Sequence, residues 1–196
     1  YKTGQKSFDY CDVSQGVGLQ MLLYLFALEQ GGQALFGEKQ RCAGVEYFPA
    51  RVPYLSADGP LTPEETEKER SKQWMRSGLF LHDACVLEAM EPEEGRIRLP
   101  VSQNKNGELT GALATAEQFR ALEGYVFRML ADLVTDIASG NVSPNPYSRG
   151  SNFDVCRFCP YGSVCHPEEK AQRRNFRSLK AEEFWELVEK EEKAHG

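Results

Sequence analysis

The 196-residue sequence has no apolar run of the length that spans a bilayer. Its longest apolar run, Met21–Leu28, is far shorter than the roughly 18–20 residues of a membrane helix, so it predicts a buried helix and no membrane role. No secretory signal pattern is present at the start, and we therefore expect a cytoplasmic location. The sequence also starts at Tyr1 without an initiator Met, which we interpret as a piece excised from a larger protein.

The sequence has no excess of positive charge. Its formal net charge is -6, which argues against a free-standing DNA-coating protein, because phosphate binding requires Lys and Arg. One stretch differs from the rest: residues 149–177 contain six basic residues and three acidic ones. This local basic segment is either a solvated surface or a DNA contact. The DNA-contact candidates are Arg157, Arg173, Arg174 and Arg177.

What is present fits one globular α/β protein. Hydrophobic residues make up 41% of the chain and charged residues 27%, enough for one core and too few charges for a disordered chain. Helical spacing of apolar residues predicts helices over Gly16–Glu29, Thr115–Gly140 and Lys180–Ala194. A capping box at Thr62 predicts a charged helix that ends at Gly78, followed by a short helix over Asp83–Met90. A second capping box, Thr115–Gln118, starts the longest predicted helix.

Few strands are expected. Residues 1–4 would follow a strand, and Ala43–Leu55 is interpreted as a strand because it is rich in β-branched and aromatic residues. Pro49 and Pro53 cannot donate to a ladder, which places that part at an edge of the sheet or beyond it. Arg96–Val101 is a further strand candidate, and Ser102–Gly111 is a polar loop or hairpin tip. These strands are too few for a complete sheet.

Three of the six cysteines form a compact group, Cys156-x2-Cys159-x5-Cys165. Thiolates at this spacing can converge on one inorganic centre. Both zinc and a [4Fe–4S] cluster take four ligands, so one ligand is missing under either interpretation. The alternative is a set of loop thiols without metal. The other three cysteines are most simply buried or half-buried thiols: Cys11, Cys42 and Cys85. Any of them could supply the missing ligand, as could a cysteine upstream of residue 1.

Two short motifs near the N-terminus are weak signals on their own. Tyr1-Lys2-Thr3-Gly4 is compatible with an ordinary lysine at a strand end. Gln20 and Tyr24 share a helix face because they are four residues apart, which is true of any two helical residues at that spacing.

Together with the cysteine group, these motifs resemble the PD-(D/E)xK nucleases of the RecB-like type. Within that group the sequence is most similar to the C-terminal nuclease region of the AddB family, the B subunits of AddAB-type ATP-dependent helicase–nucleases. The resemblance covers the whole chain, including Ala43–Phe48, Gly78–Asp83 and Phe176–Leu179.

The resemblance implies a partial PD-(D/E)xK (restriction-endonuclease-like) core in a single nuclease domain. Its expected segments are a core of strand, helix and edge strand (1–55), a mainly helical insert (56–140), a cysteine-cluster loop with a basic segment (141–179) and a terminal helix (180–196).

The resemblance also implies a chemistry. Such nucleases use Mg²⁺ to activate water for attack on DNA. Lys2 matches the lysine beside the metal, and Gln20 and Tyr24 match the helix motif that borders the site. Cys156, Cys159 and Cys165 match three of the four ligands of a structural [4Fe–4S] cluster.

The family's metal-binding acids and its first cluster cysteine have no counterpart in the sequence, so we expect this polypeptide alone to cleave no DNA. The implied partners are an AddA-type helicase–nuclease subunit, ATP bound by the parent complex, and DNA undergoing double-strand-break repair by recombination. The alternatives are a non-catalytic scaffold that guides DNA, a Cas4-like single-domain exonuclease, which has a much shorter segment between Tyr24 and Cys156, and a DNA-reading zinc finger.

Overall fold

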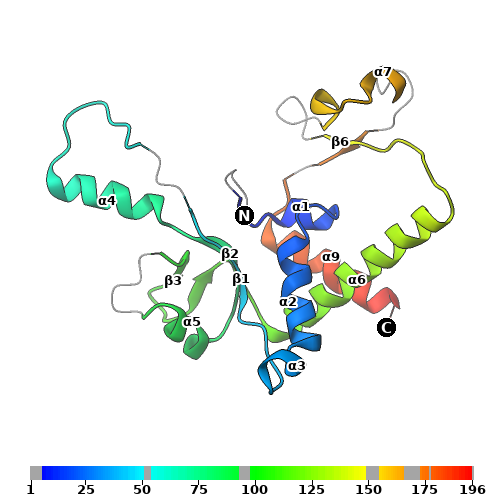
Figure 1. Cartoon of the computed structure of the whole chain (residues 1–196). Helices are drawn as coiled ribbons and strands as arrows, with labels where there is room; N and C mark the ends of the chain where they lie inside the picture. Colours follow the sequence, from blue (N-terminus) through cyan, green and yellow to red (C-terminus); the bar gives the residue numbers. More distant parts are fainter. Residues whose placement is uncertain are drawn as a thin grey trace. The chain divides into compact units, whose positions relative to one another are not determined.

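The structure is a computed structural model of the chain, and it describes residues 6–50, 54–92, 98–148, 155–165, 173–176 and 178–195. The chain divides into two compact units. The first contains residues 1–9 and 18–123, and the second contains residues 10–17 and 124–196, so the division falls within the long helix α6 (Ala116–Ala138). Figure 1 labels the elements of each unit.

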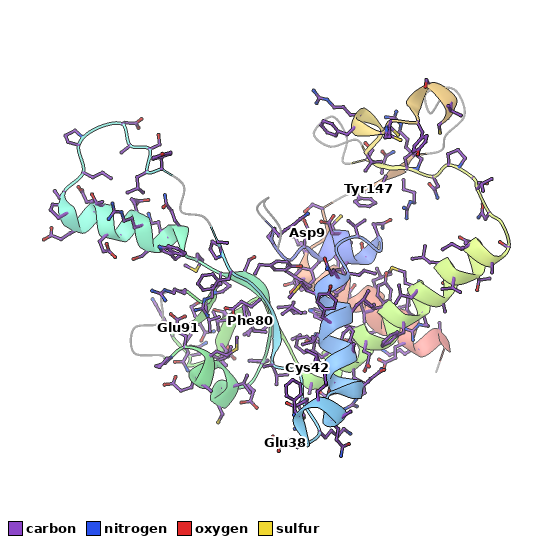
Figure 2. The ribbon with its side chains drawn as sticks, in the orientation of Figure 1. Asp9, Glu38, Cys42, Phe80, Glu91 and Tyr147 are labelled. Carbon is purple, nitrogen blue, oxygen red and sulfur yellow. The ribbon has the colours of Figure 1, made fainter. Side chains whose placement is uncertain are left out.

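A three-stranded sheet of order β1-β2-β5 is the centre of the first unit. Strand β1 (Gly44–Tyr47) pairs antiparallel with β2 (Ser77–Leu81), and β2 pairs parallel with β5 (Leu113–Ala114). The buried residues of this region include Phe80 and Leu87, which Met90 and Leu113 help to cover. Figure 2 labels Phe80 on β2.

Strand β2 corrects an expectation from the sequence. The sequence predicts that Gly78 ends a helix, but the preceding helix α4 (Pro63–Gln73) ends earlier and Gly78 lies within β2. A Cβ atom on Gly78 would lie 2.0 Å from the carbonyl oxygen of Val45 on the neighbouring strand. This glycine is therefore explained by close approach of β1 to β2, and the segment between residues 56 and 140 carries strands as well as helices.

The helix predicted over Gly16–Glu29 begins later than expected, as α2 (Gln20–Gly31). A separate short helix, α1 (Tyr10–Ser14), precedes it and was not predicted. Gly16 and Gly18 separate the two with φ angles of 75° and 71°, a left-handed conformation that glycine adopts without strain. Likewise β1 covers only four residues of the strand predicted over Ala43–Leu55, whose residues 51–53 lie outside the described part.

Both predicted capping boxes are confirmed. Thr62 accepts from the Glu65 amide while the Glu65 carboxylate accepts from the Thr62 amide, which starts α4. Thr115 and Gln118 make the same reciprocal pair at the start of α6. The predicted hairpin tip is also present as the antiparallel pair β3 (Val101–Gln103) and β4 (Leu109–Gly111). The strand predicted over Arg96–Val101 lies partly outside the described residues, and β3 begins where that prediction ends.

The second unit is built around α9 (Ala181–His195), the terminal helix that the sequence predicts. Phe184 is fully buried, with its ring centroid 5.0 Å from that of Tyr10 on α1 and 6.4 Å from that of Tyr125 on α6. The Tyr125 hydroxyl donates to the carbonyl of Ser14 at 3.1 Å. Aromatic packing and this hydrogen bond thus join α1, α6 and α9.

The smaller elements complete the structure: α3 (Gln33–Phe36), α5 (Ala84–Met90), β6 (Tyr147–Ser148), the 3-10 helix η2 (Val155–Phe158), α7 (Gly162–Cys165) and β7 (Arg174–Asn175). Among the described residues no helix is both long enough and apolar enough to cross a membrane.

Candidate functional site

Gln20 and Tyr24 are joined on the exposed face of α2. The amide Nε2 of Gln20 donates to the Tyr24 hydroxyl at 2.7 Å, one helical turn away. Tyr24 remains 55% exposed, while Leu22 and Phe26 on the other face of the helix are 1% exposed. Because the apolar face anchors the helix in the first unit, the polar pair is held toward solvent.

The Tyr24 oxygen accepts the Gln20 hydrogen bond, so its own O–H proton can point toward an added ligand. The Gln20 oxygen is likewise an acceptor that the bond to Tyr24 does not use. The pair therefore offers one donor and one acceptor side by side. The third predicted catalytic residue, Lys2, lies outside the described residues, so its position beside this pair remains a prediction.

Cys42 precedes β1 in the chain, and its thiol contacts α2. Its thiol donates to the carboxylate of Glu29 and also approaches the carbonyl oxygen of Leu25 at 3.7 Å. Burial, then the hydrogen bond and negative charge of Glu29, raise the pKa of this thiol far above its ordinary value. Cys42 is therefore a protonated, half-buried thiol; Figure 2 labels it. Of the other scattered cysteines, Cys11 is buried and Cys85 is exposed.

A hollow of about 340 Å³ lies where β2 and β5 end. His82, Asp83 and Thr115 line it, together with Arg41 and Cys42. The Asp83 carboxylate already accepts from the amides of residues 85 and 86. The Thr115 hydroxyl accepts from residue 118. These polar groups therefore cap helices, and we assign them no catalytic role.

The cysteine group lies in the second unit, between β6 and β7. The amide of Cys159 donates to the carbonyl of Cys156 at 3.2 Å, which makes the two-residue spacer a tight turn. The amide of Cys165 donates to the carbonyl of Tyr161 at 2.9 Å and closes the short helix α7. All six cysteines of the chain belong to the described residues, and none of them forms a disulfide.

The donor chemistry suits a thiolate-bound centre but is incomplete. Cys156 and Cys165 are half-buried and Cys159 is exposed, so the group is accessible to a metal. Within the described ranges no three His, Cys, Asp or Glu side chains are arranged to hold a single metal ion. A [4Fe–4S] cluster also takes four ligands, but each binds a different iron, so they stand farther apart than the ligands of one ion, and three thiols supply part of this set.

The basic candidates are on the surface of the same unit. The Arg157 guanidinium lies 5.8 Å from the centre of the Phe158 ring, and both side chains are exposed. Arg173 and Arg174 are also exposed, and the Arg174 Nε donates to the carbonyl of Asn145 at 3.2 Å. Arg177 lies outside the described residues. Three of the four candidates are thus exposed cations on one unit.

Comparison with known proteins decides the family. The model of the PD-(D/E)XK nuclease superfamily matches residues 1–166, which include the Gln20–Tyr24 pair and all three cysteines of the group. The chain belongs to this superfamily. The mixed α/β fold with small sheets agrees with that assignment.

The curated relatives are named as the B subunits of ATP-dependent helicase/deoxyribonucleases. The protein of Acetivibrio thermocellus is 35% identical over 98% of this chain, and that of Thermoanaerobacter sp. (strain X514) is 34% identical over 100%. The protein of Oceanobacillus iheyensis is 30% identical over 100%. The chain spans only 17–18% of the length of these relatives. The similarity to the B-subunit nuclease region that the sequence indicated is thus confirmed.

Proposed function

We propose that the chain is the nuclease region of a DNA-cleaving B subunit in an AddAB-type helicase–nuclease. The observation that carries the proposal is the match along 98–100% of the chain to helicase/deoxyribonuclease subunits. The long segment between Tyr24 and Cys156 takes part in that match, which favours a B subunit over a small single-domain nuclease. The parent complex would hydrolyse ATP, pair this subunit with an AddA-type partner in the cytoplasm and process broken DNA ends for recombination.

In this proposal the Gln20–Tyr24 pair borders the reacting phosphate. The Tyr24 hydroxyl accepts a hydrogen bond from Gln20 and would donate one, through its O–H group, to a phosphate oxygen. We propose the oxygen of Gln20, which the bond to Tyr24 does not use, as the acceptor that would hold the Lys2 ammonium in place. Lys2 then offsets the negative charge that develops on the phosphate. Bound Mg²⁺ would supply Lewis-acid activation of the attacking water.

Cys156, Cys159 and Cys165 are proposed as three of the four ligands of a structural [4Fe–4S] cluster. The tight turn from Cys156 to Cys159 and the short helix before Cys165 support this assignment, because each fixes one part of the ligand set. The cluster would join this segment to a fourth ligand and fix its position.

The exposed cations of the second unit are proposed to contact DNA phosphates. Arg157, Arg173 and Arg174 are exposed in the structure, and Arg177 follows them in sequence. Phosphate contacts make binding depend on salt, so replacing one of them with Ala should weaken DNA binding and reduce its salt dependence by about one charge.

The polypeptide of residues 1–196 carries no counterpart of the family's metal-binding acids, so we propose that it is inactive by itself. The test is cleavage of linear DNA with Mg²⁺ by this polypeptide, compared with the complete subunit and its partner. Mg²⁺-dependent cleavage by the purified polypeptide would show that it carries metal ligands which the family comparison misses.

The decisive variant is Lys2→Ala in the complete complex. It should lower the cleavage rate by roughly 100-fold or more while iron content and DNA binding are kept. Lys6→Ala is the matched control, because Lys6 is an exposed lysine four residues along the chain. Full cleavage by Lys2→Ala would remove Lys2 from the mechanism. DNA binding without any cleavage by the unaltered complex would instead support the scaffold alternative.

A further inference from the structure

The strands on either side of the cysteine group are paired with each other. We call the residues between these strands, 149–173, the cysteine segment. Strand β6 (Tyr147–Ser148) and strand β7 (Arg174–Asn175) run parallel, with Tyr147 opposite Arg174. The amide of Arg174 donates to the carbonyl of Pro146, and the amide of Phe176 donates to the carbonyl of Ser148, both at 2.9 Å. Two residues per strand make a marginal ladder, so something else must support it.

That support is an aromatic stack. The rings of Tyr147 and Phe176 are nearly parallel, with an interplanar angle of 8° and centroids 4.7 Å apart. The side chain of Arg174 adds a hydrogen bond to the carbonyl of Asn145, and Ser148 is 4% exposed. The ladder, the stack and the arginine together form what we call the base of the cysteine segment. Figure 2 labels Tyr147 at this base.

The cysteine segment is the crossover connection between the parallel strands β6 and β7. Parallel neighbours are usually joined by a crossover of a dozen or more residues, most often a helix. Here the crossover is residues 149–173, and it contains all three cysteines of the group. Closing a loop of this length costs chain entropy, and contacts at its base offset that cost before any ligand binds.

We propose that Tyr147 and Phe176 are positioning residues for the cysteine group. They keep the segment closed at its base when no inorganic centre is bound, which limits how far Cys156, Cys159 and Cys165 can separate. The claim that the two rings close the segment rests on the structure alone. The claim that they affect retention of an inorganic centre rests on the proposed ligand role of the three cysteines. The inorganic centre would then complete a segment that the protein already closes, and the two aromatic rings would govern how firmly it is retained.

The structural claim is tested by amide hydrogen exchange in the metal-free 196-residue chain. Phe176→Ala should speed exchange at the amides of Cys159 and Cys165 by roughly five- to tenfold, because opening of the base frees both ends of the segment. Amides of α9 should keep their rates. Phe176→Tyr keeps a ring and should restore slow exchange.

Tyr161→Ala is the matched control, since it removes a tyrosine from the same segment that is 69% exposed and lies outside the base. It should change exchange less than Tyr147→Ala does. If Tyr147→Ala and Phe176→Ala leave the rates at Cys159 and Cys165 unchanged, the base does not hold the segment and the proposal is overturned.

The consequence is tested in the complete subunit, purified without oxygen. Iron content and visible absorption are followed after a chelator is added. Tyr147→Ala and Phe176→Ala should lose iron roughly fivefold faster than the unaltered subunit and the Tyr161→Ala variant. Equal retention in all of them would overturn the positioning role. If the unaltered subunit contains no iron, the cluster part of the proposed function fails, and hydrogen exchange still decides whether the two rings close the segment.

Discussion

The amide of Gln20 donates to the hydroxyl of Tyr24 at 2.7 Å on the exposed face of α2. The bond lies along one helical turn and leaves the tyrosine proton free to act as a donor. Neither side chain contributes to the core, since Tyr24 is 55% exposed and Gln20 is exposed as well. The pair is therefore accessible to a ligand and adds little to the stability of the fold.

This arrangement predicts a separation of activity from stability. Tyr24→Phe in the complete complex should lower DNA cleavage by roughly tenfold, because in the proposed site it removes one hydrogen-bond donor to phosphate. Its thermal unfolding should change little, because the ring stays in place. Tyr54→Phe is the control, since Tyr54 is a fully exposed tyrosine of the same unit. Equal cleavage by both variants would remove the Tyr24 hydroxyl from the site.

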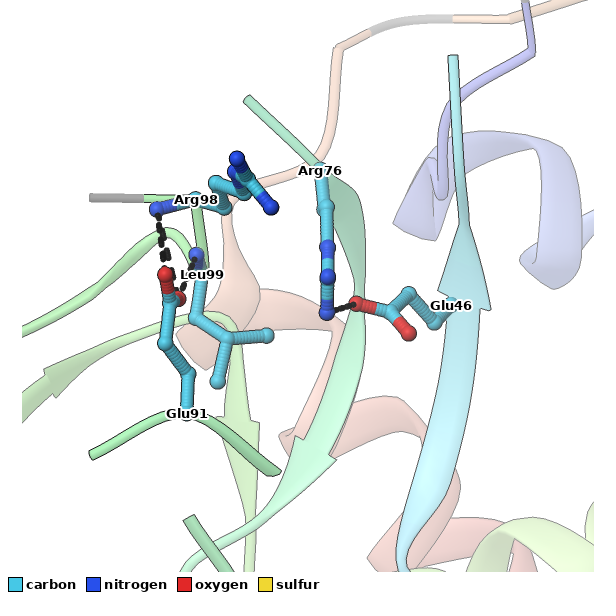
Figure 3. Close-up of polar contacts among 5 residues, drawn as sticks. All are labelled: Glu46, Arg76, Glu91, Arg98 and Leu99. Atoms are coloured by element: carbon cyan, nitrogen blue, oxygen red, sulfur yellow. Dashed lines mark hydrogen bonds and ion pairs between the residues drawn. The ribbon is translucent and has the colours of Figure 1, made fainter. Parts of the chain in front are cut away.

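A second prediction concerns the link between β1 and β2. The Arg76 guanidinium donates to the Glu46 carboxylate at 2.9 Å, and its carbon lies 5.1 Å from the centre of the Phe48 ring. Figure 3 shows this pair beside the Glu91 carboxylate, which accepts from the amides of Arg98 and Leu99. The Arg76 side chain is only 18% exposed, so its charge is partly shielded from water.

Arg76→Ala should therefore lower the free energy of unfolding by about 1–2 kcal/mol, since it removes a half-buried ion pair and a cation–ring contact. Lys72→Ala breaks a comparable pair with Glu69, in which the side chains are 59% and 43% exposed. That change should cost no more than about 0.5 kcal/mol. Denaturant unfolding measures both, and equal losses would show that burial of Arg76 has no energetic consequence.

The thiol of Cys42 leads to a third prediction, on reactivity. Its raised pKa leaves little thiolate, which is the nucleophilic form, and Cys85 is exposed where Cys42 is half-buried. Iodoacetamide at pH 8 should modify Cys85 well before Cys42. Glu29→Gln removes the negative charge beside Cys42 and should speed its alkylation by about tenfold, with no change at Cys85. Peptide mass spectrometry gives both rates, and rapid alkylation of Cys42 in the unaltered chain would contradict the buried hydrogen bond.

The same thiol predicts how stability depends on pH. Its pKa is raised in the folded chain above the ordinary value of 9.0, so the folded state holds the proton more tightly than the unfolded state. This contribution is complete below pH 9 and declines as the pH rises toward the folded-state pKa. Between pH 9 and 10.5, the free energy of unfolding of Cys42→Ala should therefore fall less than that of the unaltered chain. If the free energy of unfolding falls equally with pH in both proteins, groups other than Cys42 cause the loss of stability at alkaline pH.

The two capping boxes were predictable because each depends on residues three apart in sequence, such as Thr62 and Glu65. Strand β2 was not predictable in this way, because its continuous apolar residues show no alternation and Gly78 resembles a helix terminator. The reason for this glycine is a neighbouring strand much earlier in the chain, which no local pattern contains. A buried strand is identified by its partners.

The candidate site was predictable to a similar extent. The spacing of Gln20 and Tyr24 is local, and the hydrogen bond between them follows from it. The stacked rings of Tyr147 and Phe176 lie on opposite sides of the cysteine group in the sequence. The residues around each ring give no indication that the two rings are in contact. Side chains that close a long loop therefore become visible only in the folded chain.

The last prediction concerns α6, the helix that the spacing of apolar residues predicts over Thr115–Gly140. Val126 is fully buried, but Val134, two turns later on the same helix, is 65% exposed. Val126→Ala should lower the free energy of unfolding by about 2 kcal/mol, through lost burial and a small cavity, while Val134→Ala should stay within about 0.5 kcal/mol. Each variant is measured by chemical denaturation of the 196-residue chain. Similar losses for both would mean that the end of α6 is covered in solution, and sedimentation at several concentrations would then show whether a second copy covers it, because only self-association makes the loss at Val134 depend on concentration.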